Sequence, residues 1–335
     1  MSSARRWLRL AKGATGYALA RARGESFPFS ATFILTHRCN FRCRYCDIPA
    51  AADHEMSADE FRAAIDELAD VGLVRASFSG GEALLRADAL EIMAHARARG
   101  LMVSMNTNAF LAVERLDALA EVLDLLVVSL DGPEPVHDLV RRRKGSYARV
   151  IELLAGARAR GLPTATITVL NQLNLHVVDE VLELARQHEF HAYFQPAYRS
   201  CFDHRQGLDT ALSPEVLRDL SSRLLAARRR GARVGASPGY LERLARAPSF
   251  GDCSTCTAGR FWCTVLPDGN LVPCHLTSSD TPPPNGRELG FAEAFRRLPR
   301  DKHGPGCAIS PYQESDLIFS LDRAAMTSAL RRLRR

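Results

Sequence analysis

Three cysteines lie close together near the start of the chain, in the stretch THRCNFRCRYCDIP, residues 36–49. Cys39, Cys43 and Cys46 cannot pair off completely in disulfides, and they are one short of the four ligands that structural zinc prefers. Soft thiolates select zinc, Cu(I) or iron–sulfur clusters. We therefore expect a metal centre here. It is either a cubane cluster with one iron open to an outside ligand, or a zinc site completed by His37.

A second group of cysteines lies in the C-terminal part, in the stretch CSTCTAGRFWCTVLPDGNLVPCH, residues 253–275. Its first two cysteines have the Cys-x2-Cys spacing that zinc ribbons also use. The Asp-Gly pair within PDG is a turn signal, so we expect a hairpin with strands at 260–266 and 270–274. The cysteines concerned are Cys253, Cys256, Cys263 and Cys274, with Cys307 further on.

The remaining composition limits the class of protein. The chain has 335 residues and nine cysteines, and its first 25 residues lack the apolar region of a secretory signal. In a reducing compartment, clustered cysteines bind metal or react rather than form disulfides. No stretch of about 18 uncharged apolar residues is present to span a membrane. We expect a cytoplasmic protein.

The basic N-terminal segment, residues 1–28, has three alternative explanations. An amphipathic helix around Trp7, Leu8, Leu10 and Ala11 could rest on an anionic membrane surface, which would make the protein membrane-associated. The segment could instead be an organellar transit peptide, or a helix packed on the domain behind it. The net charge is +6, but no aromatic residues are interleaved with the basic runs. We therefore expect no nucleic-acid partner.

A repeated pattern must position the cysteines. Helical segments end at Gly72, Gly100 and Gly161, and a β-run begins directly after each glycine. We expect strands near 31–36, 74–79, 101–106, 125–129, 164–169 and 191–195. We expect helices near 57–71, 86–99, 112–122, 146–160, 176–188 and 214–230. Such alternation predicts an α/β fold with a parallel sheet, a partial (β/α)6 TIM-like barrel.

Helix starts are marked as well. Ser57 and Glu60 form a capping box, and Ser213 precedes Pro214 at a first helical position. The alternation stops after residue 231, where Cys, Pro and Gly become dense. We therefore expect a core domain over 29–234 and a small Cys-rich α+β extension over 235–335.

Ligands in parallel β/α folds gather beyond the carboxyl ends of the strands. Four unusual loops follow the first four predicted strands, and the first carries the three cysteines. The other three are SGGE at 79–82, MNTNA at 105–109 and SLDG at 129–132. We expect these loops to form one site.

The pattern CNFRCRYC, with Tyr45 at its aromatic position, resembles the signature of the radical S-adenosylmethionine (SAM) superfamily. The resemblance covers residues 31 to about 230. It implies that the three cysteines hold a [4Fe–4S] cluster whose open iron is chelated by SAM. It also implies reductive cleavage of SAM to a 5′-deoxyadenosyl radical that abstracts hydrogen from a substrate. An external donor such as flavodoxin or ferredoxin would supply the electron.

The resemblance also implies roles for the other loops. Gly80, Gly81 and Glu82 are similar to the GGE motif that receives the SAM amino group, with Ala83 in place of the usual Pro. Arg141 is similar to an arginine that binds the SAM carboxylate or ribose, whereas we expect Arg142 and Arg143 to be solvated. The remaining residues implied to contact SAM are Asn106, Asn108, Ser129 and Asp131.

The C-terminal stretch resembles the auxiliary-cluster extension called SPASM, or its shorter form, twitch. A full SPASM domain needs seven or eight cysteines, so this chain would hold one auxiliary [4Fe–4S] cluster. The implied ligands are Cys253, Cys256, Cys274 and Cys307, with Cys263 as a spare that could replace Cys307. A zinc ribbon remains the alternative. Cys201 stands alone, either buried or lining the active site.

We therefore expect a radical SAM enzyme, an oxidoreductase or a radical-type modifying enzyme. Its substrate would be a small molecule, a lipid or a peptide. Two alternatives stay open. One is a non-catalytic zinc or iron–sulfur scaffold, and the other is an RNA-modifying radical SAM enzyme.

Overall fold

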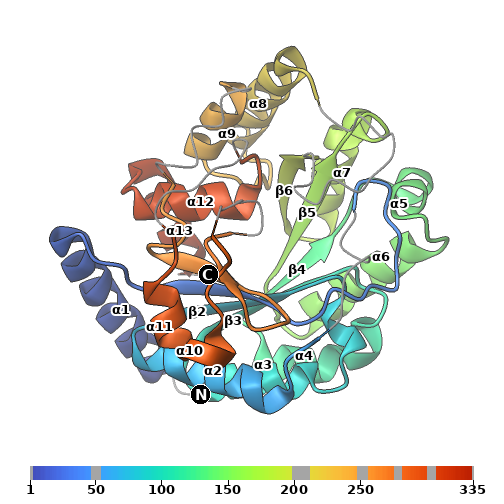
Figure 1. Cartoon of the computed structure of the whole chain (residues 1–335). Helices are drawn as coiled ribbons and strands as arrows, with labels where there is room; N and C mark the ends of the chain where they lie inside the picture. The colour runs from blue at the N-terminus through green and yellow to red at the C-terminus, as the bar shows by residue number, and fades with distance from the viewer. Residues whose placement is uncertain are drawn as a thin grey trace.

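One eight-stranded sheet organises the chain (Figure 1). The computed structural model describes residues 3–46, 54–197, 212–246, 256–274, 281–299 and 307–333. The strand order is β6-β5-β4-β3-β2-β1-β7-β8. The strands are β1 (Ser30–Ile34), β2 (Arg75–Ser79), β3 (Met102–Thr107), β4 (Leu125–Ser129), β5 (Thr164–Leu170), β6 (His191–Pro196), β7 (Trp262–Val265) and β8 (Leu271–Val272).

Helices precede, separate and follow these strands. The first part of the chain forms α1 (Ser3–Arg23), α2 (Ala58–Asp70), α3 (Ala89–Ala98), α4 (Leu116–Val122), α5 (Glu134–Arg141), α6 (Ser146–Ala159) and α7 (Val178–Gln187). The second forms α8 (Pro214–Arg229), α9 (Pro238–Ala245), α10 (Gly286–Leu289), α11 (Phe291–Arg296), α12 (Ser310–Phe319) and α13 (Arg323–Leu333). Short 3-10 turns, η2 (Ala83–Leu85), η3 (Val113–Arg115) and η4 (Leu175–Val177), precede α3, α4 and α7.

The first six strands are parallel and pair in chain order, which confirms the α/β class and the partial (β/α)6 barrel. Helices α2, α3, α4, α6 and α7 lie outside the curved sheet (Figure 1). The expected hairpin is also present, because β7 and β8 pair antiparallel around the turn that contains Gly269. β7 also pairs in parallel with β1, so this hairpin continues the sheet of the barrel. The domain boundary near residue 235 stays a prediction.

The local signals at helix ends are confirmed. The backbone N–H of Glu60 donates to Ser57 Oγ at 3.3 Å, and that of Ser57 donates to Glu60 Oε2 at 2.8 Å. Ser213 caps α8 with a single bond, because its Oγ accepts from the backbone N–H of Val216 at 3.4 Å, and Pro214 is at the first helical position. Gly72, Gly100 and Gly161 all have positive φ angles, which glycine adopts at little cost.

One helix of the first half was not expected. Residues 134–141 follow the SLDG loop and form α5, which begins at the Pro133–Glu134–Pro135 segment. Proline is compatible with a first helical turn because the N–H it lacks has no partner there. Two prolines within three residues usually indicate a loop, so the sequence pattern did not predict this short helix.

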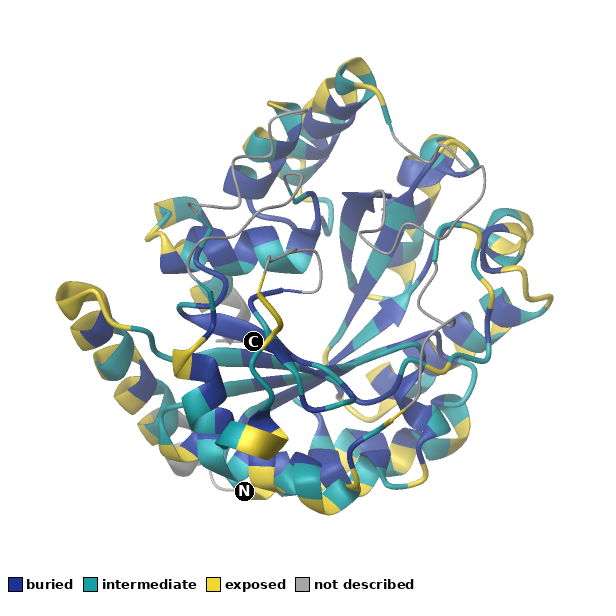
Figure 2. Ribbon diagram, in the orientation of Figure 1, coloured by how far each residue is buried: buried dark blue, intermediate teal, exposed yellow. Residues whose placement is uncertain are grey.

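Packing between the sheet and its helices follows the two-residue period of the strands. In β1 and β2, alternate residues are buried, and those toward the helices include Phe33 and Phe78. The two rings stack with centroids 5.4 Å apart. Burying one such side chain contributes about 1.5–3 kcal/mol. The opposite, concave face of these two strands is only partly buried (Figure 2).

Helix α1 packs against the domain behind it, which is one of the three alternatives stated for the N-terminal segment. Its Gly16 lies against the ring of Phe27, and its Ala20 is buried. The Tyr17 hydroxyl donates to the backbone oxygen of Phe319 at 2.7 Å. Among the described residues, no helix combines the length and the apolar character that a membrane span requires.

The docking of α1 can be tested at Gly16. A β-carbon there would overlap the Phe27 ring, so we expect Gly16→Val to lower the free energy of unfolding by about 1–3 kcal/mol through overpacking. Urea denaturation measures this change. The control is Ala14→Val, at an exposed position of the same helix, which should cost only the lower helix propensity of Val. Equal losses in the two variants would contradict the packed arrangement.

Candidate active site

The three clustered cysteines follow β1 on one loop. The side chains of Cys39, Cys43 and Cys46 all have intermediate exposure. The backbone N–H of Phe41 donates to Cys39 Sγ at 3.4 Å, a contact typical of thiolates that bind iron–sulfur clusters. Within the described ranges, no three His, Cys, Asp or Glu side chains are arranged to share a single metal ion. Cluster cysteines each bind a different iron, so a cubane does not require such convergence.

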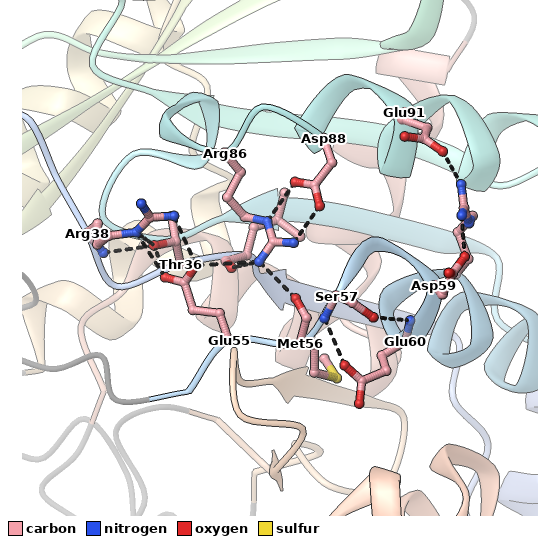
Figure 3. A network of polar contacts seen from close by, with 12 residues as sticks. Thr36, Arg38, Glu55, Met56, Ser57, Asp59, Glu60, Arg86, Asp88 and Glu91 are labelled. Carbon is pink, nitrogen blue, oxygen red and sulfur yellow. Dashed lines mark hydrogen bonds and ion pairs between the residues drawn. The ribbon is translucent and has the colours of Figure 1, made fainter.

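Both ends of the cysteine loop are held by one carboxylate, Glu55 (Figure 3). Its oxygens accept from the Thr36 hydroxyl and from the Arg38 guanidinium, the latter at 3.0 and 3.2 Å. Arg86 donates to the same carboxylate at 3.4 Å and to the Met56 backbone oxygen at 2.9 Å. Burial alone would raise the pKa of Glu55, but these donors outweigh burial and lower it. The loop is therefore pinned where it leaves β1 and where it approaches α2.

The SGGE loop lies directly against the cysteine loop. The backbone N–H groups of Gly81 and Glu82 donate to the backbone oxygens of Thr36 and Arg38 at 2.8 and 2.9 Å. A β-carbon on Gly80 or Gly81 would overlap those same two oxygens. The glycines are thus required by the close approach of the two loops.

Glu82 joins this loop to the end of β3. Its buried carboxylate accepts from the Thr107 hydroxyl at 3.0 Å and from the backbone N–H of Asn108 at 2.9 Å. Burial raises the pKa of Glu82. The Asn108 amide then donates to Asn40 Oδ1 at 2.8 Å, inside the cysteine loop. In this structure Glu82 holds three loops together, and its expected contact with the SAM amino group stays a prediction.

A buried ion pair between Asp131 and Arg141 contacts the cysteine loop at Cys43 and Tyr45. Arg141 Nε is 2.6 Å from Asp131 Oδ2, and the Tyr45 hydroxyl donates to the same oxygen at 3.0 Å. Arg141 Nη1 also approaches Cys43 Sγ at 3.7 Å. Burial lowers the pKa of Arg141, but Asp131, Tyr45 and Cys43 more than offset it, so the guanidinium stays charged. A cation at this distance suits a thiolate bound to iron.

Neighbouring residues complete the environment of Asp131. Its second oxygen accepts from the Val169 N–H at 2.9 Å, and its own N–H donates to His137 Nδ1 at 3.1 Å. Burial lowers the pKa of His137 to about 4, so this ring is neutral. Arg142, as expected, is exposed, and it ends α5 with a positive φ.

Two further predicted residues face the concave side of the sheet. Asn106 is near the end of β3, and Ser129 ends β4. Both are partly exposed, and neither side chain forms a hydrogen bond within the part of the chain that the structure describes. Their polar groups are available to a ligand at this edge.

Sequence reasoning missed Glu55 and Arg86. Glu55 is a single acid before a helix, and Arg86 follows an ordinary apolar stretch. Neither has a spacing that indicates its role, because their contact depends on the parallel pairing of β1 with β2.

The described cysteines of the second group lie in two different hydrophobic clusters. Cys263 is fully buried in the main core, where its register partner in β1 is Ala31, and burial raises its pKa to about 12. Cys256, Cys274 and Cys307 instead belong to a separate cluster with Phe261 and Trp262. Cys253 and Cys201 lie outside the described residues.

Known proteins with similar sequences identify the family of this chain. The family model for the radical SAM superfamily matches residues 33–185. The chain is 32% identical to the PqqA peptide cyclase of Xanthomonas axonopodis pv. citri over 264 residues, covering 75% of this chain and 69% of that protein. The chain belongs to the radical SAM superfamily. It is also 29% identical to the PqqA peptide cyclase of Rhodopseudomonas palustris over 315 residues, 86% of this chain and 81% of that protein.

Solved structures show the same fold. SuiB of Streptococcus suis bound to S-adenosylmethionine matches 84% of this chain and 69% of its own, with a TM-score of 0.68 and 16% identity. The protein anSMEcpe with bound AdoMet matches 82% of this chain and 81% of its own, with a TM-score of 0.65 and 19% identity. A likeness at this identity supports the fold alone.

The protein is therefore a radical SAM enzyme, and the non-catalytic scaffold is excluded. When bound, its [4Fe–4S] cluster and SAM supply a 5′-deoxyadenosyl radical that takes a hydrogen atom from the substrate. The three thiols, the Phe41 N–H and the Arg141 guanidinium suit such a cluster.

Gly81 provides a direct test of this site. In Gly81→Ala the new methyl group would meet the Arg38 backbone oxygen, so the cysteine loop must shift. We expect at least a tenfold loss of SAM cleavage and reduced iron retention, measured as 5′-deoxyadenosine and as bound iron. The control is Gly161→Ala, which imposes positive-φ strain in open space and should lower stability while leaving iron content unchanged. A fully active Gly81→Ala enzyme would contradict the packing of the two loops.

Proposed function

We propose that this radical SAM enzyme modifies a peptide and carries one auxiliary iron–sulfur cluster. The similarity to PqqA peptide cyclases carries the peptide assignment, because it extends over 75–86% of this chain and 69–81% of those proteins, and so reaches into the C-terminal extension. It favours a peptide over the small-molecule, lipid and RNA alternatives. Two proteins of the same fold have also been solved with peptides, SuiB with precursor peptide SuiA and anSMEcpe with Kp18Cys peptide.

We assign the residues of the SAM site as follows. Cys39, Cys43 and Cys46 hold the cluster, and Arg141 balances its charge from below. Tyr45 and Glu82 position the loops through Asp131 and Asn108. Because the Asp131 carboxylate is already occupied by Arg141 and Tyr45, its role is to orient those side chains. The groups that remain for direct contact with SAM are Gly80, Gly81, Asn106 and Ser129. The side chain of Asn108 is already hydrogen-bonded to Asn40 and to the backbone of Phe110, so its role is also to position the loops.

The auxiliary cluster rests on Cys256, Cys274 and Cys307, with Cys253 as the fourth ligand. Backbone N–H groups of Ala258 and Ile309 donate to the sulfurs of Cys256 and Cys307 at 3.5 and 3.4 Å. This arrangement repeats the contact at Cys39 and suits thiolates in a cluster. The burial of Cys263 in the main core supports Cys307 in preference to it.

Two further assignments complete the proposal. The domains are the N-terminal segment 1–28, the SAM core 29–234 and the extension 235–335. The electron comes from an external donor such as flavodoxin or ferredoxin.

SAM cleavage and peptide dependence can be tested together. The enzyme is reconstituted without oxygen, and 5′-deoxyadenosine is measured with SAM, a strong reductant and a pool of synthetic peptides. We expect peptides to increase product formation in the wild type, and the Cys39→Ala/Cys43→Ala/Cys46→Ala variant to form none. Mass spectrometry then identifies the altered peptide. Stimulation by small molecules but by no peptide would overturn the peptide assignment and leave the SAM chemistry in place.

The auxiliary cluster has its own test, with a matched control in the same segment. Cys256→Ala should lower bound iron by about half relative to the wild type, because one of two cubane clusters loses a ligand. Cys263→Ala should retain all the iron and lose only packing energy, since this thiol lies in the core. Iron and sulfide analysis of the two variants gives the answer. An iron loss in Cys263→Ala with none in Cys256→Ala would reverse the ligand assignment.

A further inference from the structure

The concave face of the sheet is more accessible than a packed barrel interior. In β1, β2 and β4, residues toward the helices are buried, while the alternate residues on the concave face are partly exposed (Figure 2). The interior of a complete (β/α)8 barrel is filled by side-chain layers. In these three strands the concave face is therefore only partly covered by other side chains, whereas Ser104 of β3 and Thr264 of β7 on the same face are buried.

Arg75 lies on this face, and no carboxylate of the described residues is paired with it. It is the first residue of β2, at one of the partly exposed concave positions. Among the described residues, no carboxylate pairs with its side chain and no acceptor is hydrogen-bonded to it. Burial, with no acid to offset it, lowers the pKa of Arg75. By contrast, the buried arginines Arg86 and Arg141 each have a carboxylate beside them, Glu55 and Asp131 respectively.

A row of hydroxyl groups crosses the sheet next to Arg75. Strand register aligns Thr264, Thr32, Ser77 and Ser104 across four neighbouring strands, all on the concave face. Ser104 Oγ and Thr264 Oγ1 are buried and have no hydrogen-bond partner in the described structure. A buried hydroxyl without a hydrogen-bond partner is unfavourable, because it has lost its contacts with water. These oxygens can therefore gain from donating to an acceptor that enters from the concave side.

We propose that Arg75, Ser77 and Ser104 form a binding site for a carboxylate of the substrate. Ser77 is two residues beyond Arg75 on the same face, and Ser104 is the partner of Ser77 on β3. A guanidinium with adjacent hydroxyl donors matches a carboxylate, which accepts several charge-assisted hydrogen bonds. The site rests on the proposed function in one respect, because it assigns the carboxylate to the peptide.

This site is distinct from the SAM site. Arg75 begins β2 and Ser79 ends it beside the SGGE loop, so their backbones are separated by about 13 Å at about 3.3 Å per residue. A carboxylate at Arg75 would thus lie below the cysteine loop, on the concave side. It would anchor the substrate at a distance from the atom that reacts.

The first experiment uses propionate as the carboxylate probe and propionamide as its neutral isostere. Binding to the cluster-loaded enzyme is measured by NMR of 13C-labelled probe at constant ionic strength. We expect propionate to bind the wild type, Arg75→Gln to bind it at least tenfold more weakly, and Arg75→Lys to retain part of the affinity. The control Arg158→Gln, at an exposed arginine on α6, should bind like the wild type. Thermal melting and SAM binding establish that each variant is folded.

Two results of this experiment would overturn the site. One is propionate binding that Arg75→Gln leaves unchanged, and the other is equal binding of propionamide. Neither depends on turnover or on any peptide, so a failure of the proposed peptide activity would be seen separately.

The second experiment tests where the carboxylate comes from. Peptides that stimulate SAM cleavage are compared with versions in which every carboxylate is an amide. We expect the amide versions to have at least a tenfold higher KM in the wild type, and the two versions to have the same KM in Arg75→Gln. Equal KM values in the wild type would overturn the assignment to the peptide.

Discussion

The candidate site depends on the buried ion pair between Asp131 and Arg141. The Asp131 carboxylate holds Arg141 from α5, Tyr45 from the cysteine loop and the Val169 N–H from β5. Removing one partner from a buried ion pair costs about 3–5 kcal/mol, because the other charge is left uncompensated. The cysteine loop and β5 are therefore held in fixed positions relative to the segment 131–141, around the thiols. Asp131 compensates the charge of the buried Arg141 guanidinium and holds it beside Cys43.

The backbone contact between the cysteine loop and the SGGE loop adds a second constraint. Parallel pairing of β1 with β2 brings both loops out at the same edge, and the two glycines let them touch without intervening side chains. Glu82 then extends the contact to β3 through Thr107 and Asn108. The site is thus a set of loops held to one another largely through main-chain groups, and the side chains of Asn106 and Ser129 remain available to a ligand.

Much of this arrangement could be predicted because it depends on local signals. The capping box at Ser57 and the glycines at helix ends fixed the β/α alternation, and the alternation placed the four loops at one edge. Long-range contacts could not be predicted in the same way. The pairing of β7 with β1 and the clamp of Glu55 with Arg86 join residues that no periodicity relates. The role of Cys263 also depended on strand register, because one residue along β7 separates the core from the concave face.

The clamp at Glu55 has a consequence for how the enzyme acquires its metal. Bringing the ends of a chain segment together costs conformational entropy, and the cost grows slowly with segment length. Here the contacts of Thr36, Arg38 and Arg86 with Glu55 tie residue 36 to residue 55 by side-chain hydrogen bonds. These bonds offset part of the entropy cost of closing the cysteine loop. Less of the binding free energy of a cluster is then needed to hold the ends of the loop together.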